Sequence, residues 1–258
     1  MALRVVVVID FCKHGDGIMI YSHSMLSAQP ERTVYCQDAL TWLKDQSTLE
    51  DCSIITSMPD ISEFPQLSLD QWKAWFTDTA KLILSRLDRR GVAIFYQTDI
   101  KTDGIWVNKG YLCQKAAEQM GCDLLWHKIV CRKPVGTIAF GRPGYAHLLC
   151  FSRGPRNNLS KSVADILPQG GETTWTRGMG TQACLAAVRY VIENTETRTV
   201  VAPFCGHGTV LAVGTYLGLR TIGIELSAKR SRKARSLQFD GTSLQFDSRR
   251  VTPQTDVE

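Results

Sequence analysis

The sequence predicts an α/β fold built around a doubly wound, mostly parallel β-sheet. Short apolar segments typical of buried strands alternate with segments that carry apolar residues at helical spacing. A glycine-rich turn, 203–209 (PFCGHGT), joins one apolar segment to a predicted helix, and the next apolar segment, 221–224, ends at Glu225. With 258 residues, 44% of them hydrophobic, the chain can bury a large core.

The first 151 residues predict six strands and three helices. Residues 69–89 place Trp72, Trp75 and Phe76 on roughly one face of a helix, and Gly121 ends another. The apolar runs are bounded by turn-forming residues. We expect strands at 5–11, 32–36, 52–56, 92–96, 124–131 and 147–151, and helices at 39–45, 69–89 and 109–120.

The second part of the chain predicts a loop and then a strand–turn–helix–strand unit. Residues 152–180 are polar and contain proline and glycine, which favours a surface loop. We expect helices at 182–194 and 210–217 and strands at 200–203 and 221–224. The sequence SLQFD occurs at 236–240 and again at 243–247, and two copies are too few for a repeat architecture. They predict one terminal helix or strand, followed by a disordered tail at 248–258.

Composition limits the class of protein. The nine cysteines are scattered without a Cys-x-x-Cys pair, so neither a zinc ribbon nor a redox site is expected, and no metal site is predicted. Their odd number and irregular spacing favour a reducing, intracellular compartment. The apolar run 5–9 is too short for a signal peptide or a membrane span. The net charge of +5 permits an anionic partner such as RNA or DNA.

The turn at 203–209 has the properties of half a nucleotide-binding site. Gly206 and Gly208 lack side chains, so the backbone can approach a cofactor, and Thr209 can open the following helix. The carboxylate of Glu225 is placed to accept hydrogen bonds from two ribose hydroxyls. There is no third glycine and no phosphate-binding lysine, so the turn is neither a dinucleotide fingerprint nor a triphosphate loop. The alternative is a tight crossover with an incidental surface glutamate.

Several segments resemble amino-methyltransferases that use S-adenosylmethionine to modify adenine N6 or cytosine N4 in nucleic acids. They are 37–40 (QDAL), 54–60 (IITSMPD), 84–94 (LSRL to GVAI), 201–209 (VAPFCGHGT) and 223–225 (GIE). In that family Ile-Ile-Thr runs into (Asp/Asn/Ser)-Pro-Pro-(Tyr/Phe/Trp), and the cofactor loop reads Asp-Pro-Phe-x-Gly-Ser-Gly-Thr. The similarity covers residues 35–235. The catalytic segment comes before the cofactor loop, as in the circularly permuted members.

The resemblance implies a Rossmann-like class I methyltransferase fold with a seven-stranded sheet. It implies a single domain over 1–247, with a substrate half at about 1–151, a loop at 152–180 and a cofactor half at 181–235. The residues it assigns to S-adenosylmethionine are Asp38, Thr181, Gln182, Pro203, Phe204, Cys205, Gly206, Gly208, Thr209 and Glu225.

The same resemblance places Ser57, Met58, Pro59 and Asp60 around the target amine. A polar side chain and a backbone carbonyl held by proline would accept the two N–H bonds of the amine. A base inside a duplex would have to be flipped out to reach them.

The sequence departs from the family pattern at three positions. Met58 stands where the first proline usually lies, Asp60 replaces the aromatic residue that stacks on the target base, and Ala202 replaces the acidic residue that opens the cofactor loop. Asp60 could act as a general base, bind a different amine, cap the helix that follows or mark lost activity.

The preferred function is methylation of a base amine in nucleic acid, with RNA ahead of DNA because the chain has no room for a separate DNA-recognition domain. An inactive binding or scaffold protein and a methyltransferase for proteins or small molecules are the alternatives, and a partner subunit is possible.

Three further features could belong to a functional site. The basic run 229–235, together with Arg132, Lys133, Arg142, Arg153 and Arg156, is either a track for phosphates or a solvated helix face. Trp175 and Arg177 could form a stacking and phosphate pair. Cys205 is either a reactive thiol or a small apolar filler, and the filler is the commoner case.

Overall fold

The computed structural model describes residues 30–158 and 162–247. The strand predicted at 5–11 and the tail predicted at 248–258 lie outside the described residues. The described strands are β1 (Arg32–Tyr35), β2 (Cys52–Thr56), β3 (Ala93–Gln97), β4 (Ile100–Thr102), β5 (Ile105–Val107), β6 (Asp123–Cys131), β7 (Tyr145–Ser152), β8 (Ile166–Leu167), β9 (Thr199–Pro203), β10 (Arg220–Ile224), β11 (Leu237–Phe239) and β12 (Leu244–Phe246). The helices are α1 (Ala39–Asp45), η1 (Ile61–Glu63), α2 (Leu69–Ser85), α3 (Lys109–Gln119), α4 (Thr181–Asn194), α5 (Thr209–Tyr216) and α6 (Ala228–Ser236).

One large sheet runs through the molecule in the order β1-β10-β9-β2-β3-β7-β6-β8. The first five of these strands are parallel to their neighbours, and β7 is antiparallel to both β3 and β6. The predicted doubly wound, mostly parallel α/β fold is confirmed. The eighth strand, β8, was not expected, because two residues inside the polar loop 152–180 are too few to show a strand pattern.

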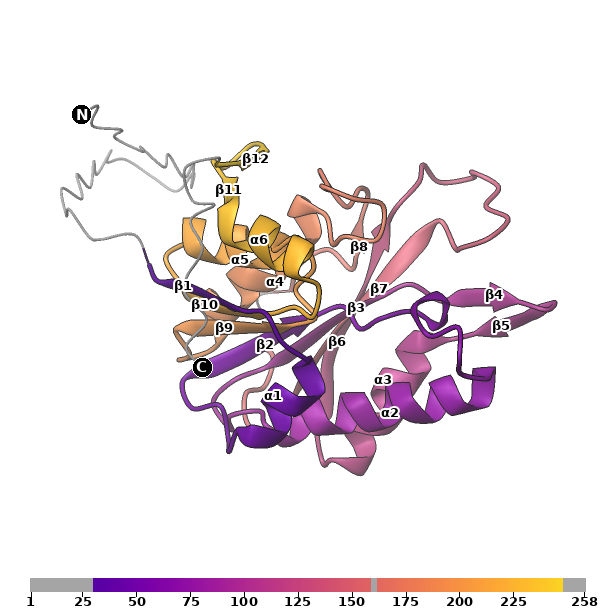
Figure 1. The fold of residues 1–258 in the computed structure, drawn as a ribbon, viewed down its shortest axis with the longest axis horizontal. Helices are drawn as coiled ribbons and strands as arrows, with labels where there is room; N and C mark the ends of the chain where they lie inside the picture. The colour runs from indigo at the N-terminus through magenta and orange to yellow at the C-terminus, as the bar shows by residue number, and fades with distance from the viewer. Residues whose placement is uncertain (1–29, 159–161, 248–258) are drawn as a thin grey trace.

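Helices cover both faces of the sheet. Helices α4, α5 and α6 lie on one face and α1, α2 and α3 on the other (Figure 1). Two apolar cores, one on each face, hold these helices in place. Strands β2, β3 and β9 are buried throughout, because a central parallel strand with helices on both sides has no solvent-facing side. No described helix has the length and apolarity needed to cross a membrane.

The centre of the sheet is a topological switch point. Strands β9 and β2 are parallel neighbours, paired Cys52 with Thr199, Ser53 with Val200 and Ile54 with Val201. The connection after β9 leads to α5 on one face, whereas the connection after β2 leads to α2 on the other. In such sheets the two connections part at the carboxyl ends of the strands and leave a crevice there.

Two hairpins in the structure differ from the sequence prediction. The repeat at 236–247 was expected to form one element, and that prediction is wrong: its copies form β11 and β12, which pair antiparallel. Asp240 accepts hydrogen bonds from the backbone amides of Thr242 and Ser243 and so shapes the turn between them. Strands β4 and β5 form a second small hairpin, which was not predicted. The basic run 229–235 lies within helix α6, in agreement with the helix that one of its two interpretations assumed. Each pairing joins segments of three residues, which are too short for a periodic signal.

Glycine is required at position 208 for two reasons, its backbone conformation and its close neighbour on α6. It has φ of +84° and precedes α5, and a Cβ there would lie 2.9 Å from Ala234 Cα on α6. Gly218 has a similar φ of +90°, but a Cβ there would meet nothing within 4 Å. A comparison of alanine substitutions at Gly208 and Gly218 therefore distinguishes the effect of backbone strain from that of steric contact with α6.

We expect Gly218→Ala to lower the free energy of unfolding by about 1 kcal/mol, because only the left-handed backbone is strained. Gly208→Ala should lower it by about 2–3 kcal/mol, because α6 must also move. Urea denaturation of the two variants measures both values. Equal losses would show that α6 does not press on this turn.

Candidate functional site

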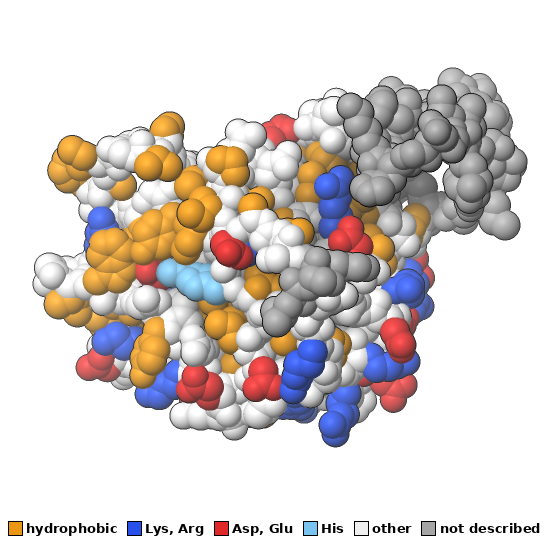
Figure 2. Space-filling view, turned by 180° about the vertical axis from the view of Figure 1, so that it is seen from behind, with side chains coloured by type: hydrophobic (Ala, Val, Ile, Leu, Met, Phe, Trp, Pro, Cys, Tyr) orange, Lys and Arg blue, Asp and Glu red, His pale blue; other side chains and the backbone are white. Residues whose placement is uncertain are grey.

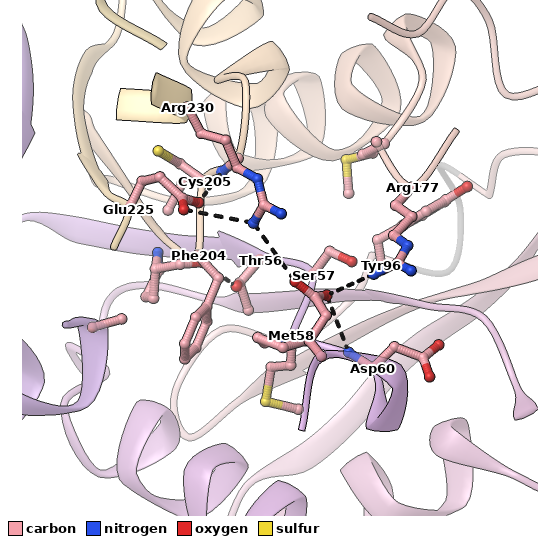
Figure 3. A pocket seen from close by; sticks show the side chains of 18 of the residues that line it. Thr56, Ser57, Met58, Asp60, Tyr96, Arg177, Phe204, Cys205, Glu225 and Arg230 are labelled. Carbon is pink, nitrogen blue, oxygen red and sulfur yellow. Dashed lines mark hydrogen bonds and ion pairs between the residues drawn. The ribbon is translucent and has the colours of Figure 1, made fainter. Parts of the chain in front are cut away.

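A cavity of about 290 Å³ lies at the carboxyl ends of β9, β10 and β2 (Figure 3). It opens between the predicted cofactor loop and the predicted catalytic segment. The predicted site residues that line it are Asp38, Ser57, Met58, Pro59, Asp60, Pro203, Phe204, Cys205, Gly206, Thr209 and Glu225. The β2–β9 pairing thus brings together two segments that lie 147 positions apart in the sequence, measured from Thr56 to Pro203.

The glycine-rich turn has a strained backbone. Phe204 and Gly206 both have positive φ, +60° and +59°. The amide of Cys205 donates to the carbonyl of Ile224 at 2.9 Å, which ties the turn to the end of β10. A non-glycine residue in this conformation is uncommon and marks a turn that its surroundings hold in place.

Glu225 is buried at the tip of β10 and holds the turn by hydrogen bonds. Its Oε2 accepts from the Gly206 amide at 3.0 Å, and its Oε1 accepts from the Ser227 amide at 2.9 Å. Arg230 Nη1 lies 3.7 Å from Oε1. A carboxylate oxygen can accept two hydrogen bonds, so Oε2 keeps capacity for a ligand hydroxyl.

The catalytic segment is joined directly to the cofactor loop. The Thr56 hydroxyl donates to the carbonyl of Pro203 at the ends of the two central strands. Ser57 is half-buried and lines the cavity, and Met58 is buried and packs into the core on the α2 face. Figure 3 shows the segment facing Phe204 and Glu225 across the cavity.

Asp60 is held by a helix cap and by two cations. It is the N-cap of η1, where its side chain accepts from the Ser62 amide and its own amide donates to Glu63 Oε1. Its Oδ2 lies 2.9 Å from Arg142 Nη2 and 3.9 Å from Lys109 Nζ. Of the alternatives open for Asp60, the structure shows the helix cap.

Lys109 is a cavity residue that the sequence analysis missed. It opens α3, is only 3% exposed, and its ammonium lies over the rings of Trp72 and Phe76. Burial lowers the pKa of Lys109, and the nearby charge of Asp60 opposes this shift. A lysine at the start of a helix is usually solvated, so no sequence signal marks it.

Ion pairs cross the cavity from one half of the fold to the other. Glu63 contacts Arg177 Nη1 at 3.4 Å and Arg230 Nη1 at 3.6 Å, and Arg230 also contacts Glu225. Figure 3 shows dashed contacts that run between the two sides of the cavity. Glu63 was not predicted as a site residue, because its position follows only from η1.

Trp175 and His207 form a stacked pair beside the glycine turn. Their ring centroids are 5.2 Å apart with an interplanar angle of 25°, and the Arg230 guanidinium lies 4.8 Å from the Trp175 ring centroid. A Cβ at Gly206 would come within 3.3 Å of Trp175. Trp175 therefore packs on the turn itself, while Arg177 binds Glu63.

Three residues assigned to the cofactor do not line the cavity. Thr181 is buried and exchanges hydrogen bonds with the backbone of Glu172, and the Gln182 amide donates to Gly170. Gly208 packs against α6. Gly178 and Met179 line the cavity instead, because the chain turns away from it where α4 begins.

Cys205 and the basic run 229–235 were each open to two interpretations. Burial raises the pKa of Cys205 far above its ordinary value, which favours the filler role over a reactive thiol. Arg235 donates to the carbonyl of Val34, and Lys233 lies over the ring of Phe246. Most of the basic run therefore has intramolecular contacts, so α6 is a packed helix more than an open phosphate track.

Aromatic side chains from several elements line the cavity although Asp60 is not aromatic. They are Phe64, Trp75, Tyr96, Trp175 and Phe204. Burial raises the pKa of Tyr96 to about 12, so its phenol stays protonated. The cavity therefore has aromatic surface on which a planar ring could pack, and this surface comes from residues outside the segment 57–60.

His207 makes stability depend on pH. Burial first, and then the charges of Lys233, Arg230 and Lys229, lower the pKa of His207 to about 4 from its ordinary 6.5. Between these values the unfolded chain binds the proton and the folded chain does not, so stability falls as pH falls from 6.5 to 4. We expect His207→Gln to reduce this loss, measured as the free energy of unfolding at about pH 7, 5.5 and 4. Parallel pH profiles for the two proteins would contradict the assignment.

Comparisons with known proteins show the fold. No protein-family model matches the sequence, and no curated protein matches it. TTHA0409 of Thermus thermophilus, described as a DNA modification methylase and solved with S-adenosyl-L-methionine, is 17% identical with a TM-score of 0.60, covering 79% of this chain and 91% of that one. PvuII DNA methyltransferase, cytosine-N4-specific, is 15% identical with a TM-score of 0.59, covering 80% and 87%. M1.HpyAVI in complex with SAM is 15% identical with a TM-score of 0.52, covering 79% and 96%. The chain has the fold of these methyltransferases.

Proposed function

We propose that this protein is an S-adenosylmethionine-dependent methyltransferase that acts on a base amine of nucleic acid. One observation carries the proposal: the glycine turn with Glu225 and the segment 57–60 open into one cavity at the switch point of the sheet. Ligands of open α/β sheets bind in this crevice. Structures with the same fold are described as DNA methylases and as complexes with SAM, which supports the same chemistry here.

The cofactor side of the cavity fits S-adenosylmethionine. Glu225 Oε2 offers an acceptor for a ribose hydroxyl, and the turn at Gly206 lets the ligand approach the backbone. Asp38 lies at the cavity edge, although its side chain also caps α1. When bound, the cofactor supplies a methyl group on a sulfonium centre. Ala202 offers no carboxylate to the methionine ammonium, so binding must depend on the other contacts.

The target side fits an exocyclic amine. The half-buried Ser57 hydroxyl and a backbone carbonyl of the segment preceding Pro59 can accept the two amine N–H bonds and hold the lone pair toward the methyl group. Asp60 forms an ion pair with Arg142 and caps η1, so it lines the pocket and is not available as a general base. The rings of Trp75 and Tyr96 supply the apolar surface for the base.

The expected preference for RNA over DNA gains no support. It rested on the small size of the chain, but the structures described as DNA methylases are themselves covered to 87–93% of their length by this chain. Size therefore does not separate the two substrates. The proposal is accordingly for a nucleic-acid base, with RNA and DNA as two arms of the same test.

A binding protein without catalysis is the second candidate. The observation that favours it is the ion-pair bridge of Glu63, Arg177 and Arg230, which spans the cavity between its two halves. Together with the absence of a carboxylate at Ala202, this bridge would suit a protein that retained the fold for an interaction. Substrate turnover distinguishes the two candidates.

Glu225→Ala should weaken S-adenosylmethionine binding by about tenfold or more, because the ribose loses its acceptor and the turn loses two backbone hydrogen bonds. Isothermal titration calorimetry measures the affinity. Glu50→Ala is the matched control, because Glu50 is exposed and precedes β2 at the opposite end of the strand. No binding by the wild-type protein, or equal affinity of both variants, would refute the cofactor assignment.

Methyl transfer from radiolabelled S-adenosylmethionine into total RNA and total DNA tests the reaction. We expect label in one nucleic acid, and a loss of about 10- to 100-fold in kcat for Ser57→Ala, because one acceptor for the amine is removed. Label in neither pool, with cofactor still bound, would favour the binding protein. Label in protein alone would point to a different substrate class.

A further inference from the structure

Methyl transfer to an amine releases a proton, which the groups proposed to hold the target amine cannot keep. When the amine nitrogen bonds to the methyl carbon, the bond from that carbon to sulfur breaks and sulfur retains the electron pair. The nitrogen is then a cation and must lose one proton. The Ser57 hydroxyl and a backbone carbonyl accept hydrogen bonds but are too weakly basic to retain that proton at neutral pH. A base on the target side of the cavity would speed its loss.

Most acidic and basic side chains of the cavity are unsuited to this task. Four carboxylates line the cavity, and each is already held by cations or backbone amides: Asp38, Asp60, Glu63 and Glu225. Burial raises the pKa of the Cys205 thiol, and it raises the pKa of Tyr96 to about 12, so both groups keep their protons. Burial lowers the pKa of His207 to about 4, and this side chain stacks on Trp175 beside the cofactor turn.

Lys109 remains, among the described residues that line the cavity, as a side chain able to accept the proton. Its Nζ lies 3.9 Å from Asp60, and Figure 3 shows Asp60 beside Ser57 and across the cavity from Glu225. Lysine side chains are usually solvated, as are the blue side chains on the surface in Figure 2, whereas Lys109 is only 3% exposed. No described residue accepts a hydrogen bond from its Nζ, which is therefore open to a ligand in the cavity.

The surroundings of Lys109 favour its neutral amine. Burial lowers the pKa of Lys109, and the charge of Arg142 acts in the same direction. The N-terminus of α3, where Lys109 lies, also disfavours a cation. The acids Asp60, Cys113 and Asp99 oppose the shift. However, Asp60 already pairs with Arg142 at 2.9 Å, and Asp99 accepts from the backbone amide of Lys109 at 2.8 Å.

The ammonium that forms on proton transfer also has partners. The ring centroids of Trp72 and Phe76 lie 5.8 and 5.5 Å from Nζ, within the range of cation–π attraction. Asp99, below the start of α3, forms its own ion pair with His147 at 3.0 Å. The rings therefore stabilise the charge weakly, and the proton can pass on to solvent.

We propose that the side chain of Lys109 is the proton acceptor of the methyl transfer. The inference rests on the proposed function and adds a catalytic residue to it. The methylated nitrogen gives one proton to the neutral Nζ, which becomes an ammonium and returns the proton to solvent before the next turnover. The target amine thus ends as a neutral methylamine, and Lys109 ends as it began.

The test is the pH dependence of kcat for methyl transfer into the nucleic acid that the wild type labels. We expect the wild-type rate to rise with pH as Lys109 loses its proton and then to level off. Lys109→Met and Lys109→Arg should lower the plateau about 100-fold and abolish this rise, because neither side chain accepts the proton. Lys115→Met is the matched control, because Lys115 is an exposed lysine of the same helix.

A second measurement needs neither cofactor nor substrate. In protein with isotope-labelled lysine, NMR follows the titration of each lysine side chain, and the spectrum of Lys109→Arg identifies the Lys109 signal. We expect Lys109 to lose its proton at a lower pH than the other lysines, because it is buried beside Arg142. Added ethylamine should also restore about tenfold of the rate lost in Lys109→Ala, which a merely distorted pocket would not allow.

The outcomes separate this inference from the proposed reaction. Full activity of Lys109→Arg, an unchanged pH profile of Lys109→Met, or titration of Lys109 together with the other lysines would overturn the proton acceptor and leave the methyltransferase standing. No transfer by the wild type into RNA or DNA would refute the proposed reaction, and the proton acceptor with it. The NMR titration is made on the wild type, so it remains decisive if a substitution at the buried Lys109 unfolds the chain.

Discussion

The parallel pairing of β2 with β9 is the constraint on which the rest of the site depends. The pairing sets Ile54 opposite Val201, and the Thr56 hydroxyl closes it by donating to the carbonyl of Pro203. Because the chain leaves these strands toward opposite faces, neither connection covers the other, and the crevice between them stays open. A shift of register by one residue would move every side chain of the shifted strand to the opposite face of the sheet and displace the segment 57–60 relative to the cofactor loop.

Ion pairs at the crevice connect elements that lie far apart in the sequence. Asp60 binds Arg142 where a stacking ring is usual, and the rings that line the cavity come from other elements. Glu63, on the short helix that Asp60 caps, reaches across to Arg230 on α6. Asp60 is therefore linked to both sides of the cavity, directly through Arg142 and indirectly through the short helix that it caps.

The fold could be predicted from sequence to a large extent because its signals are local. Buried central strands such as β2 and β9 are continuous apolar runs, and α2 carries Trp72 and Phe76 at helical spacing. The missed elements, β8 and the two hairpins, have strands of two or three residues, which lie below the length at which a period can be seen. The prediction of one element for the tandem repeat was wrong because the two copies pair through a turn that Asp240 shapes.

The sequence by itself determined the order of the elements, the glycine turn, the position of Glu225 and the segment 57–60, because each follows from residues adjacent in the chain. The tertiary structure alone decided which side chains surround the cavity. Lys109 and Arg142 reach Asp60 from α3 and from the β6–β7 loop, and Thr181 turns away although its helix begins nearby. These contacts join positions far apart in the chain and depend on where the sheet places each connection, which no local pattern encodes.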